Sequence, residues 1–324
     1  MLERHKDYLI INLDLLTYAG NLENLKEIET NANYFFVRGD ICDRLLVERL
    51  VSENNIDYIV NFAAESHVDR SINDPEVFIR SNVLGTQVLL DTAKKHNINK
   101  FIQISTDEVY GSLGNEGYFT ENTPLSPNSP YSASKASADL LVRAYYKTFG
   151  LNVNITRCSN NYGPYQFPEK LVPLIIYNAI NGNKIPVYGD GLNIRDWLHV
   201  NDHCSAIDSV LHNGIIGEVY NIGGNNERTN IEIVKTIIRI LSEDLPQRGI
   251  SESLISFIED RKGHDRRYAI DSTKITQELG WKPQITFEDG IRMTVGWYLN
   301  NKKWLNSIIN EDYRSYYQKM YGEL

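Results

Sequence analysis

The stretch Lys100-Phe-Ile-Gln-Ile-Ser-Thr-Asp-Glu108 decides the fold class of this chain. Its first six residues form a short, apolar-rich run that is typical of a strand buried in a parallel sheet. The hydroxyl of Thr106 and the carboxyls of Asp107 and Glu108 follow at once. Polar groups just after such a strand lie at the carboxyl edge of the sheet, where open α/β folds bind ligands. The alternative is that the acidic pair caps the next loop or faces water.

Strand-like and helix-like segments alternate on both sides of this stretch. The pattern predicts strands at residues 8–13, 34–37, 58–62, 101–105 and 152–156, and helices at residues 43–53, 75–96 and 131–149. Strands separated by helices predict an α/β fold with a Rossmann-like, doubly wound parallel sheet. After about residue 160 the pattern becomes irregular, with many Gly, Asn and Pro residues. This part is expected to form a second, smaller α/β lobe that selects the substrate.

A Tyr and a Lys spaced four apart open the predicted helix at 131–149. Ser129 is a good N-cap and Pro130 suits the first helical position, so Tyr131 lies in the first turn. Lys135 then shares its helix face, and Gly150 is placed to end the helix. Tyr-x-x-x-Lys alone is a weak signal, and its plain alternative is a surface Tyr stacked on a Lys stem. The nearby carboxyl pair strengthens the catalytic interpretation.

The two segments together supply groups for oxidising a carbinol and for moving protons at a neighbouring C–O bond. Adjacent carboxylates repel, so one of Asp107 and Glu108 keeps its proton near neutral pH if the pair is partly buried. One protonated and one ionised carboxyl can give one proton and take another. The sequence therefore predicts an enzyme rather than a binding module.

The charge, cysteine content and hydropathy of this 324-residue chain exclude several classes of binding partner and location. Its formal net charge of −9 argues against a nucleic acid or an anionic membrane. Cys42, Cys158 and Cys204 are scattered without metal-ligand spacing, which indicates a reducing cytoplasm and no metal site. His67 and His203 show no ligand pattern either. No apolar run approaches a membrane span, and the charged start is unlike a signal peptide.

Three places after predicted strands suit a dinucleotide. Asp14 closes a strand, and an acidic residue there can accept hydrogen bonds from the adenosine ribose and disfavour NADP; its alternative is a turn or helix cap. Asp40 is placed to contact the adenine amine or to cap residues 43–53. Small residues at Ala63 and Ala64 let a backbone approach a ligand closely, although small residues also simply pack.

Nine sequence blocks, in order, resemble the extended short-chain dehydrogenase/reductases, and among them the dTDP-glucose 4,6-dehydratase family. The resemblance runs from about residue 8 to residue 298. The blocks are Asp14-Leu-Leu-Thr-Tyr-Ala-Gly-Asn-Leu22, Ala63-Ala-Glu-Ser-His-Val-Asp-Arg-Ser-Ile72, Ser105-Thr-Asp-Glu-Val-Tyr-Gly111, Pro130-Tyr-Ser-Ala-Ser-Lys-Ala136, Cys158-Ser-Asn-Asn-Tyr-Gly-Pro-Tyr165, Phe167-Pro-Glu-Lys170, Ile194-Arg-Asp-Trp-Leu198, Tyr220-Asn-Ile-Gly-Gly224 and Gly263-His-Asp-Arg-Arg-Tyr268.

The resemblance implies a dehydratase that uses NAD and regenerates it. Tyr131 would take the proton of the sugar 4-hydroxyl, helped by Lys135, while Thr106 orients that hydroxyl. Glu108 would remove the C5 proton and Asp107 would protonate the departing C6 hydroxyl. The product would be a dTDP-4-keto-6-deoxy sugar and water.

The resemblance also assigns binding residues and an assembly. It places the cofactor on Asp14, Leu15, Thr17, Gly20, Asp40, Ile41, Ala63, Ala64, Ser81, Tyr131, Lys135 and Asn161. It places the nucleotide sugar on Ser66, Thr106, Asn160, Glu169, Lys170, Arg195, Asn230, Asp260, Arg261 and His264. From the residues alone, Arg195 could instead pair with Asp196, and Glu169 with Lys170 could be a solvated loop pair. We expect a NAD-binding domain at residues 1–165 and 196–222, a nucleotide-sugar lobe at 166–195 and 223–324, and a homodimer through helices 75–96 and 131–149.

Two departures from the family pattern affect these expectations. Arg261-Lys-Gly-His264 stands where Arg-Pro-Gly-His is expected, which predicts a looser loop. No apolar strand with a Gly-rich turn precedes residue 8, so we expect the chain to be truncated, without the central strand and diphosphate cradle, and to bind NAD poorly or fold only in part. The alternatives are a nucleotide-sugar epimerase or decarboxylase, or a catalytically silent reductase that acts as a binding protein.

Overall fold

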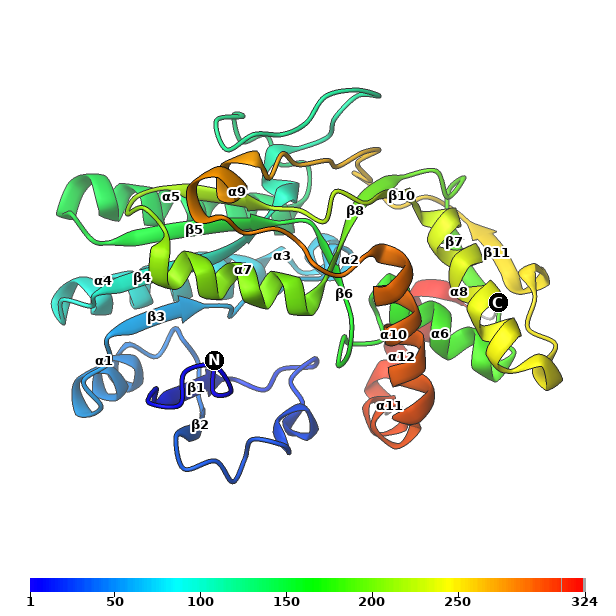
Figure 1. The fold of residues 1–324 in the computed structure, drawn as a ribbon, viewed down its shortest axis with the longest axis horizontal. Helices are drawn as coiled ribbons and strands as arrows, with labels where there is room; N and C mark the ends of the chain where they lie inside the picture. Colours follow the sequence, from blue (N-terminus) through cyan, green and yellow to red (C-terminus); the bar gives the residue numbers. More distant parts are fainter. Residues whose placement is uncertain (310, 323–324) are drawn as a thin grey trace.

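The computed structural model describes residues 1–309 and 311–322. The predicted strands lie in two parallel sheets of the first part of the molecule (Figure 1). Strands β3 (Tyr58–Asn61), β4 (Lys100–Thr106), β5 (Val153–Cys158) and β9 (Val219–Ile222) pair in that order, and β1 (Ile10–Asp14) pairs with β2 (Tyr34–Arg38). The strand predictions are therefore confirmed to within a few residues at their ends.

Helices cover both faces of the four-stranded sheet, as predicted. Helices α1 (Arg44–Glu53), α4 (Thr86–Lys95) and α5 (Pro130–Phe149) bury one cluster of apolar side chains with β4 and β5. Helices α7 (Val200–Asn213) and α9 (Thr273–Leu279) enclose a second cluster around Ile102 and Ile222. Because Phe101 and Ile102 on β4 are both fully buried, this strand is covered on each face. The fold is a doubly wound α/β sheet.

Helix α5 forms for the reasons that its sequence gives. Ser129 and Ser132 make a reciprocal capping box, Pro130 occupies the first turn, and Gly150 ends the helix in the left-handed conformation. The predicted helix at 75–96 is helical but not uniform. It consists of α3 (Pro75–Phe78), a π-helical segment η2 (Ile79–Gly85) and α4. Such π segments are common at functional sites.

The chain after residue 160 is regular, although its sequence pattern is not. This part holds the regular helices α6 (Leu171–Asn181), α8 (Asn230–Asp244) and α10 (Phe287–Asn300), which share one large apolar core. In α8 the buried residues Ile233, Val234, Ile237 and Leu241 follow the helical period. Glycine and asparagine residues lie mainly in the connections, such as Gly182 after α6. The lobe lies beside the sheet (Figure 1).

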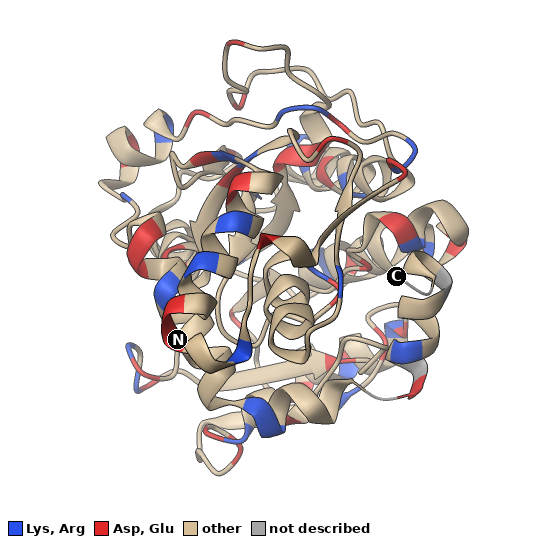
Figure 2. Cartoon of the chain, turned by 90° about the vertical axis from the view of Figure 1, so that its right-hand side faces the viewer, with Lys and Arg blue, Asp and Glu red and all other residues tan. Residues whose placement is uncertain are grey.

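The remaining elements complete the two parts of the molecule. Strands β6 (Asn160–Tyr162), β8 (Ile194–His199) and β10 (Glu227–Thr229) form one small sheet, and β7 (Ile185–Tyr188) pairs with β11 (Ile255–Ile258). The other helical segments are η1 (Leu22–Leu25), α2 (Val68–Asn73), η3 (Asp107–Tyr110), η4 (Pro246–Arg248), η5 (Glu252–Leu254), α11 (Lys302–Ile308) and α12 (Glu311–Tyr321). Across the described residues, we find no helix long and apolar enough to cross a membrane. Acidic and basic residues alternate over the face seen in Figure 2.

The sheet is interrupted between β1 and β3. Among the described residues, β1 hydrogen-bonds with β2, with Asp14 opposite Arg38, and no ladder joins β1 to β3. Side chains beside the interruption are exposed, with 47% of Leu9 and 59% of Phe62 accessible. The four-stranded sheet is therefore continuous from β3 through β4 and β5 to β9, whereas β1 and β2 are not hydrogen-bonded to it.

Candidate active site

Strand β4 and helix α5 bring the predicted catalytic residues together. Thr106 ends β4, and its hydroxyl accepts a hydrogen bond from the Glu108 backbone N–H at 3.3 Å. The same hydroxyl donates to Oδ1 of Asp107 at 3.3 Å, and it lies near enough to Tyr131, in the first turn of α5, to lower the pKa of that phenol. Tyr131 is 8% exposed and Lys135 is 4% exposed. The alternative of a surface Tyr on a Lys stem is therefore wrong.

Burial and negative charge control the protonation of Tyr131. Burial raises the pKa of its phenol well above the ordinary value, and Glu108, Cys158 and Asp107 raise it further, while the Thr106 hydrogen bond lowers it. Burial lowers the pKa of Lys135, whose ammonium donates to the Ile104 carbonyl at 2.6 Å. In this arrangement Tyr131 is a neutral phenol beside a buried amine.

Asp107 is buried and Glu108 is half-buried, so the pair is not a solvated one. Burial, Glu108 and Asp196 raise the pKa of Asp107 well above its ordinary value. Burial also raises the pKa of Glu108, but the positive charges of Arg261, Arg195 and Lys170 oppose that rise. Because three cations act on Glu108 and only Arg195 is among the main influences on Asp107, this arrangement favours Asp107 as the better proton donor of the pair. Thr106 also caps the turn that holds the pair.

Arg195 reaches the site from β8. Its guanidinium donates to the carbonyls of Ile194 at 2.8 Å and Asp265 at 2.9 Å, and it stacks on the Tyr268 ring at 4.2 Å. The alternative ion pair with Asp196 is wrong. That carboxylate instead accepts hydrogen bonds from the backbone N–H groups of Gly224 and Asn226. Arg195 is thus held rigidly while its charge acts on both carboxyls.

Lys170 and Glu169 begin the substrate lobe, just before α6. The Lys170 ammonium donates to the Ser66 carbonyl at 2.8 Å, which ties the lobe to the loop after β3. Glu169 is buried and accepts from Arg70 at 3.0 Å. The alternative of a solvated Glu–Lys pair is therefore wrong. Glu169 thus fastens the start of the second lobe to Arg70 on α2. Lys170 lies close enough to lower the pKa of Glu108.

The loop after β11 supplies the remaining predicted groups. Arg261 approaches Asp69 at 3.8 Å and acts on Glu108, and the Nδ1 of His264 lies 2.5 Å from Asp260. Burial lowers the pKa of His264 to about 4, so the ring is neutral near pH 7. Asn160 opens β6 and Asn230 opens α8, where its backbone N–H donates to Asn193.

Comparison with known proteins agrees with this arrangement. The profile of the family described as GDP-mannose 4,6 dehydratase matches residues 1–294. The chain belongs to this family. A dTDP-glucose 4,6-dehydratase from Xanthomonas campestris pv. campestris (strain B100) is 54% identical over 316 residues, which cover 94% of this chain and 90% of that protein. The predicted resemblance to these dehydratases is thereby confirmed.

Solved structures in the same family superpose closely on the chain. The dTDP-glucose 4,6-dehydratase from Bacillus anthracis in complex with NAD has a TM-score of 0.87 at 55% identity, covering 95% of this chain and 93% of that one. The dTDP-glucose 4,6-dehydratase DesIV from Streptomyces venezuelae, with NAD and TYD bound, has a TM-score of 0.87 at 50% identity, covering 92% and 89%. Both relatives bind NAD.

The cofactor residues predicted from the family lie along the carboxyl edges of the strands, but in two groups. Tyr131, Lys135 and Asn161 belong to the buried part around β4 and β5. Asp14 and Asp40 lie after β1 and β2. Of the other predicted residues, Leu15, Thr17 and Gly20 follow β1, Ile41 follows β2, Ala63 and Ala64 follow β3, and Ser81 lies on η2.

The two acidic residues of the second group hold local turns. Asp14 accepts from the Leu16 N–H at 2.7 Å, as its turn-cap alternative predicted. Asp40 accepts from the Cys42 N–H and from Arg80, each at 2.8 Å. The idea that Asp40 caps residues 43–53 is wrong, because Asp43 is the N-cap of α1. In both residues the backbone contact uses one oxygen only.

Sequence reasoning missed two residues that position this family's site. Asn82, on the π-helical segment, is buried and donates to the Glu65 carbonyl at 3.0 Å and to the Ser134 hydroxyl at 2.8 Å, while accepting from the Glu65 N–H. It therefore fixes the loop after β3 against the first turns of α5. No local signal marked it, because the stretch 75–96 contains several other polar residues.

Arg70 was also missed. Its guanidinium lies between the rings of Tyr18, at 3.6 Å, and Tyr316, at 4.0 Å, and it pairs with buried Glu169. These partners come from the loop after β1, from α12 and from the start of α6. Spacing along the chain could not have indicated this contact, because its members lie far apart in the sequence.

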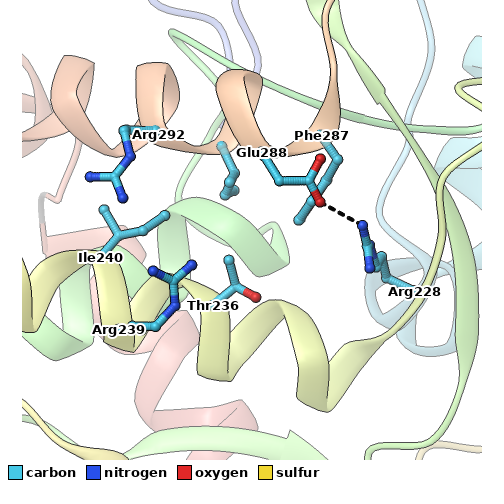
Figure 3. Close-up of a pocket in the computed structure, with 8 residues that line it drawn as sticks. Arg228, Thr236, Arg239, Ile240, Phe287, Glu288 and Arg292 are labelled. Carbon is cyan, nitrogen blue, oxygen red and sulfur yellow. Dashed lines mark hydrogen bonds and ion pairs between the residues drawn. The ribbon is translucent and has the colours of Figure 1, made fainter.

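A shallow pocket elsewhere in the second lobe contains none of these residues. It lies between α8 and α10, where Arg228, Arg239 and Arg292 line it together with Glu288 (Figure 3). Arg228 pairs with Glu288 at 2.7 Å, and Arg239 and Arg292 both pair with Glu243. Since each guanidinium already has a carboxylate partner, this pocket offers little net charge to a ligand.

Proposed function

We propose that the chain is an NAD-dependent dTDP-glucose 4,6-dehydratase, a lyase that converts dTDP-glucose to dTDP-4-keto-6-deoxyglucose and water. The observation that carries this proposal is the buried pair Asp107–Glu108 beside Tyr131, in a chain 54% identical to an enzyme of that name. An epimerase needs no such pair, because it expels no water from C6. The intact catalytic set argues equally against a silent binding protein.

The first step is oxidation at the sugar C4. Tyr131 acts as a phenolate when it accepts the proton of the 4-hydroxyl, so its buried phenol must first be deprotonated, and the positive charge of Lys135 favours that form against the burial that raises the phenol pKa. Thr106 would hold the 4-hydroxyl in place. The hydride chemistry at C4 and C6 would be supplied by NAD+ when it is bound.

Water elimination follows from the split between the two carboxyls. The 4-ketone acidifies C5, and Glu108 removes that proton, since three cations favour its ionised form. Asp107, whose raised pKa keeps it protonated, gives its proton to the C6 hydroxyl, so the C6–O bond breaks and water leaves. The resulting C5=C6 double bond takes up a hydride at C6 and a proton at C5. Because C4 has lost one hydride and C6 has gained one, the sugar as a whole keeps its oxidation level.

The residues present fit the nicotinamide end of NAD. Lys135 is buried, yet its ammonium, which has three N–H donors, makes one hydrogen bond to a carbonyl in the described structure. The Oδ1 atom of Asn161 is also buried without a partner among the described residues. Both groups are free to hold the nicotinamide ribose and amide. Asp14 would bind the adenosine ribose with its remaining oxygen.

The diphosphate of the nucleotide sugar is proposed to lie among Arg195, Arg261 and Lys170. A guanidinium binds phosphate oxygens in a fork, and both arginines act on the same carboxyl pair. Ser66, Asn160, Glu169, Asn230, Asp260 and His264 complete the proposed substrate set. Residues 1–165 and 196–222 form the proposed NAD domain, and residues 166–195 and 223–324 form the lobe, of which 310, 323 and 324 lie outside the described residues.

A homodimer through residues 75–96 and α5 is supported by exposed apolar side chains on both. Ile79 is 54% exposed, Leu84 is 45% exposed and Leu140 is 54% exposed. Contiguous apolar surface of this kind is typical of an interface. A cytoplasmic location is supported by Cys42, Cys158 and Cys204, which are all free thiols.

Mass analysis of dTDP-glucose incubated with the chain and added NAD+ tests the proposal. The expected product is lighter by one water. A product of unchanged mass but inverted C4 configuration would instead indicate an epimerase. If the substrate stays unchanged although NAD binding is detected by fluorescence, the dehydratase proposal is overturned for this chain.

A further inference from the structure

Two histidines and one aspartate meet where the N-terminal segment contacts α7. The Nε2 of His5 lies 2.9 Å from Oδ1 of Asp208, and the Nδ1 of His212 lies 3.1 Å from the same oxygen. The two imidazole rings stack with centroids 4.6 Å apart. One nitrogen from each ring and one carboxylate oxygen all lie within 4.8 Å of one another.

These separations match the first shell of a transition-metal ion. Ligands about 2.0–2.2 Å from a tetrahedral Zn²⁺ lie roughly 3.3–3.5 Å apart. The two distances to Asp208 are already close to that range, so small side-chain rotations would complete the set. Imidazole suits Zn²⁺, Cu²⁺ and Ni²⁺, whereas Mg²⁺ and Ca²⁺ prefer all-oxygen sites.

Neighbouring groups hold the ligands in suitable orientations. Arg4 donates to Oδ2 of Asp208 at 3.3 Å, which leaves Oδ1 turned toward both histidines. The Tyr8 hydroxyl lies 2.7 Å from Nε2 of His212. The Nδ1 of His212 also lies 2.8 Å from the Asp208 carbonyl, so this nitrogen must give up that hydrogen bond to bind a metal. Its Nε2–H would then donate to the Tyr8 oxygen, as the second nitrogen of a ligating histidine usually does to a nearby acceptor.

Solvent can reach the cluster. The cluster lies partly exposed, with 16% of the Asp208 side chain and 26% of the His212 side chain accessible. A metal ion could therefore enter from solvent and keep a water as fourth ligand.

We propose that His5, Asp208 and His212 form a binding site for a divalent transition metal of the Zn²⁺ class, which clamps the N-terminal segment to α7. The site is independent of the proposed active site, whose residues it does not include. No motif indicates this site, because His5 and Asp208 are 203 residues apart. Only Asp208 and His212, one helical turn apart, share a local spacing.

The test uses the full chain without a polyhistidine tag, stripped of metal. Competition with a chromophoric chelator measures Zn²⁺ affinity and stoichiometry, and Co²⁺ provides a visible absorption band that reports tetrahedral ligands. The expected result is one metal per chain. His5→Gln and His212→Gln should each weaken binding at least about tenfold, and Tyr8→Phe should weaken it less.

A matched variant separates this site from general histidine affinity. His96→Gln removes a histidine at the end of α4 that is not part of the cluster, and should leave stoichiometry and affinity unchanged. Hydrogen exchange of residues 1–8 should slow on adding Zn²⁺ to the unsubstituted chain but not to His212→Gln. The proposal is overturned if no metal binds, or if the double variant His5→Gln/His212→Gln still binds one equivalent.

Discussion

The four-stranded sheet and the β1–β2 pair carry the two halves of the proposed cofactor site, and they differ in how firmly they are held. On β4, Phe101 and Ile102 are fully buried, and the strand continues directly into the catalytic turn. On and after the β1–β2 pair, Phe35 is 53% exposed and Leu15 is 42% exposed. The catalytic residues are therefore held in place by packing that does not depend on the part of the molecule that would bind adenosine.

The exposed pair is held by local contacts instead of a continuous sheet. Arg70, sandwiched between Tyr18 and Tyr316, and the indole of Trp304, which donates to Asn24 at 2.7 Å, tie the segment after β1 to the second lobe. Perturbing the buried half should therefore change turnover, whereas perturbing the exposed half should change cofactor affinity.

The largest expected effect belongs to the buried half. Tyr131→Phe removes the proposed base and should lower kcat by about 10²–10⁴, the usual contribution of a general base. NAD affinity and the melting temperature should change little, because the ring stays packed against Phe78. Steady-state kinetics and NAD titration measure both. Tyr118→Phe, at an exposed position, is the matched control, and a similar loss there would contradict the role of Tyr131.

The next effect separates the two carboxyls. Glu108→Gln should abolish exchange of the C5 hydrogen with solvent deuterium, whereas Asp107→Asn should retain some exchange while water loss slows, each by about 10² or more in the affected step. Mass spectrometry of recovered sugar measures exchange and elimination together. Equal loss of both reactions in both variants would mean that the proposed division of roles is wrong. Glu116→Gln, in an exposed loop, provides the control.

A smaller effect, on the free energy of unfolding, is expected at Asn82, which joins the loop after β3 to α5. Asn82→Ala leaves the Glu65 backbone N–H and carbonyl without their side-chain partner and should lower the free energy of unfolding by about 1–3 kcal/mol. Urea denaturation measures the change. Asn152→Ala, which removes a single exposed hydrogen bond, should cost less. If the two variants were equally stable, Asn82 would not be a fastening point.

A substitution in the exposed half is expected to change only the affinity for NAD. Asp14→Asn should weaken NAD binding about tenfold, since a hydrogen bond to a charged acceptor contributes roughly 1.5–3 kcal/mol when fully formed and Asp14 is exposed. Turnover at saturating NAD should stay unchanged. Isothermal titration gives the affinity. A large fall in kcat at saturation would break the distinction between the two halves.

The pH dependence of stability gives the smallest effect and tests burial of the catalytic pair. The folded-state pKa of Asp107 lies above its unfolded value, so the folded chain binds this proton more tightly. Its contribution to stability is therefore complete below the unfolded pKa and is lost as pH rises through the folded pKa. Asp107→Asn should thus gain stability relative to the parent chain as pH increases. Thermal melts from pH 5 to pH 8 measure the trend, and the reverse slope would contradict it.

Much of the fold and of the catalytic group could be predicted because the signals are local. The apolar run of β4, the capping Ser129 and Pro130, and the terminating Gly150 each specify structure within a few residues. The helices after residue 160 were missed although their apolar period is clear in α8, because frequent Gly and Asn residues in the connections hid it.

The sequence by itself determined the doubly wound sheet, the polar edge after β4, and the pairing of Tyr131 with Lys135 on one helix face. These follow from periods and caps that neighbouring residues set. Only the tertiary structure decided that Arg195 leaves Asp196 to the backbone, that Arg70 pairs with Glu169, and that His5 meets Asp208. Such contacts join segments that lie far apart in the chain, and burial, which sets the charge of Asp107 and Glu108, exists only once those segments have packed.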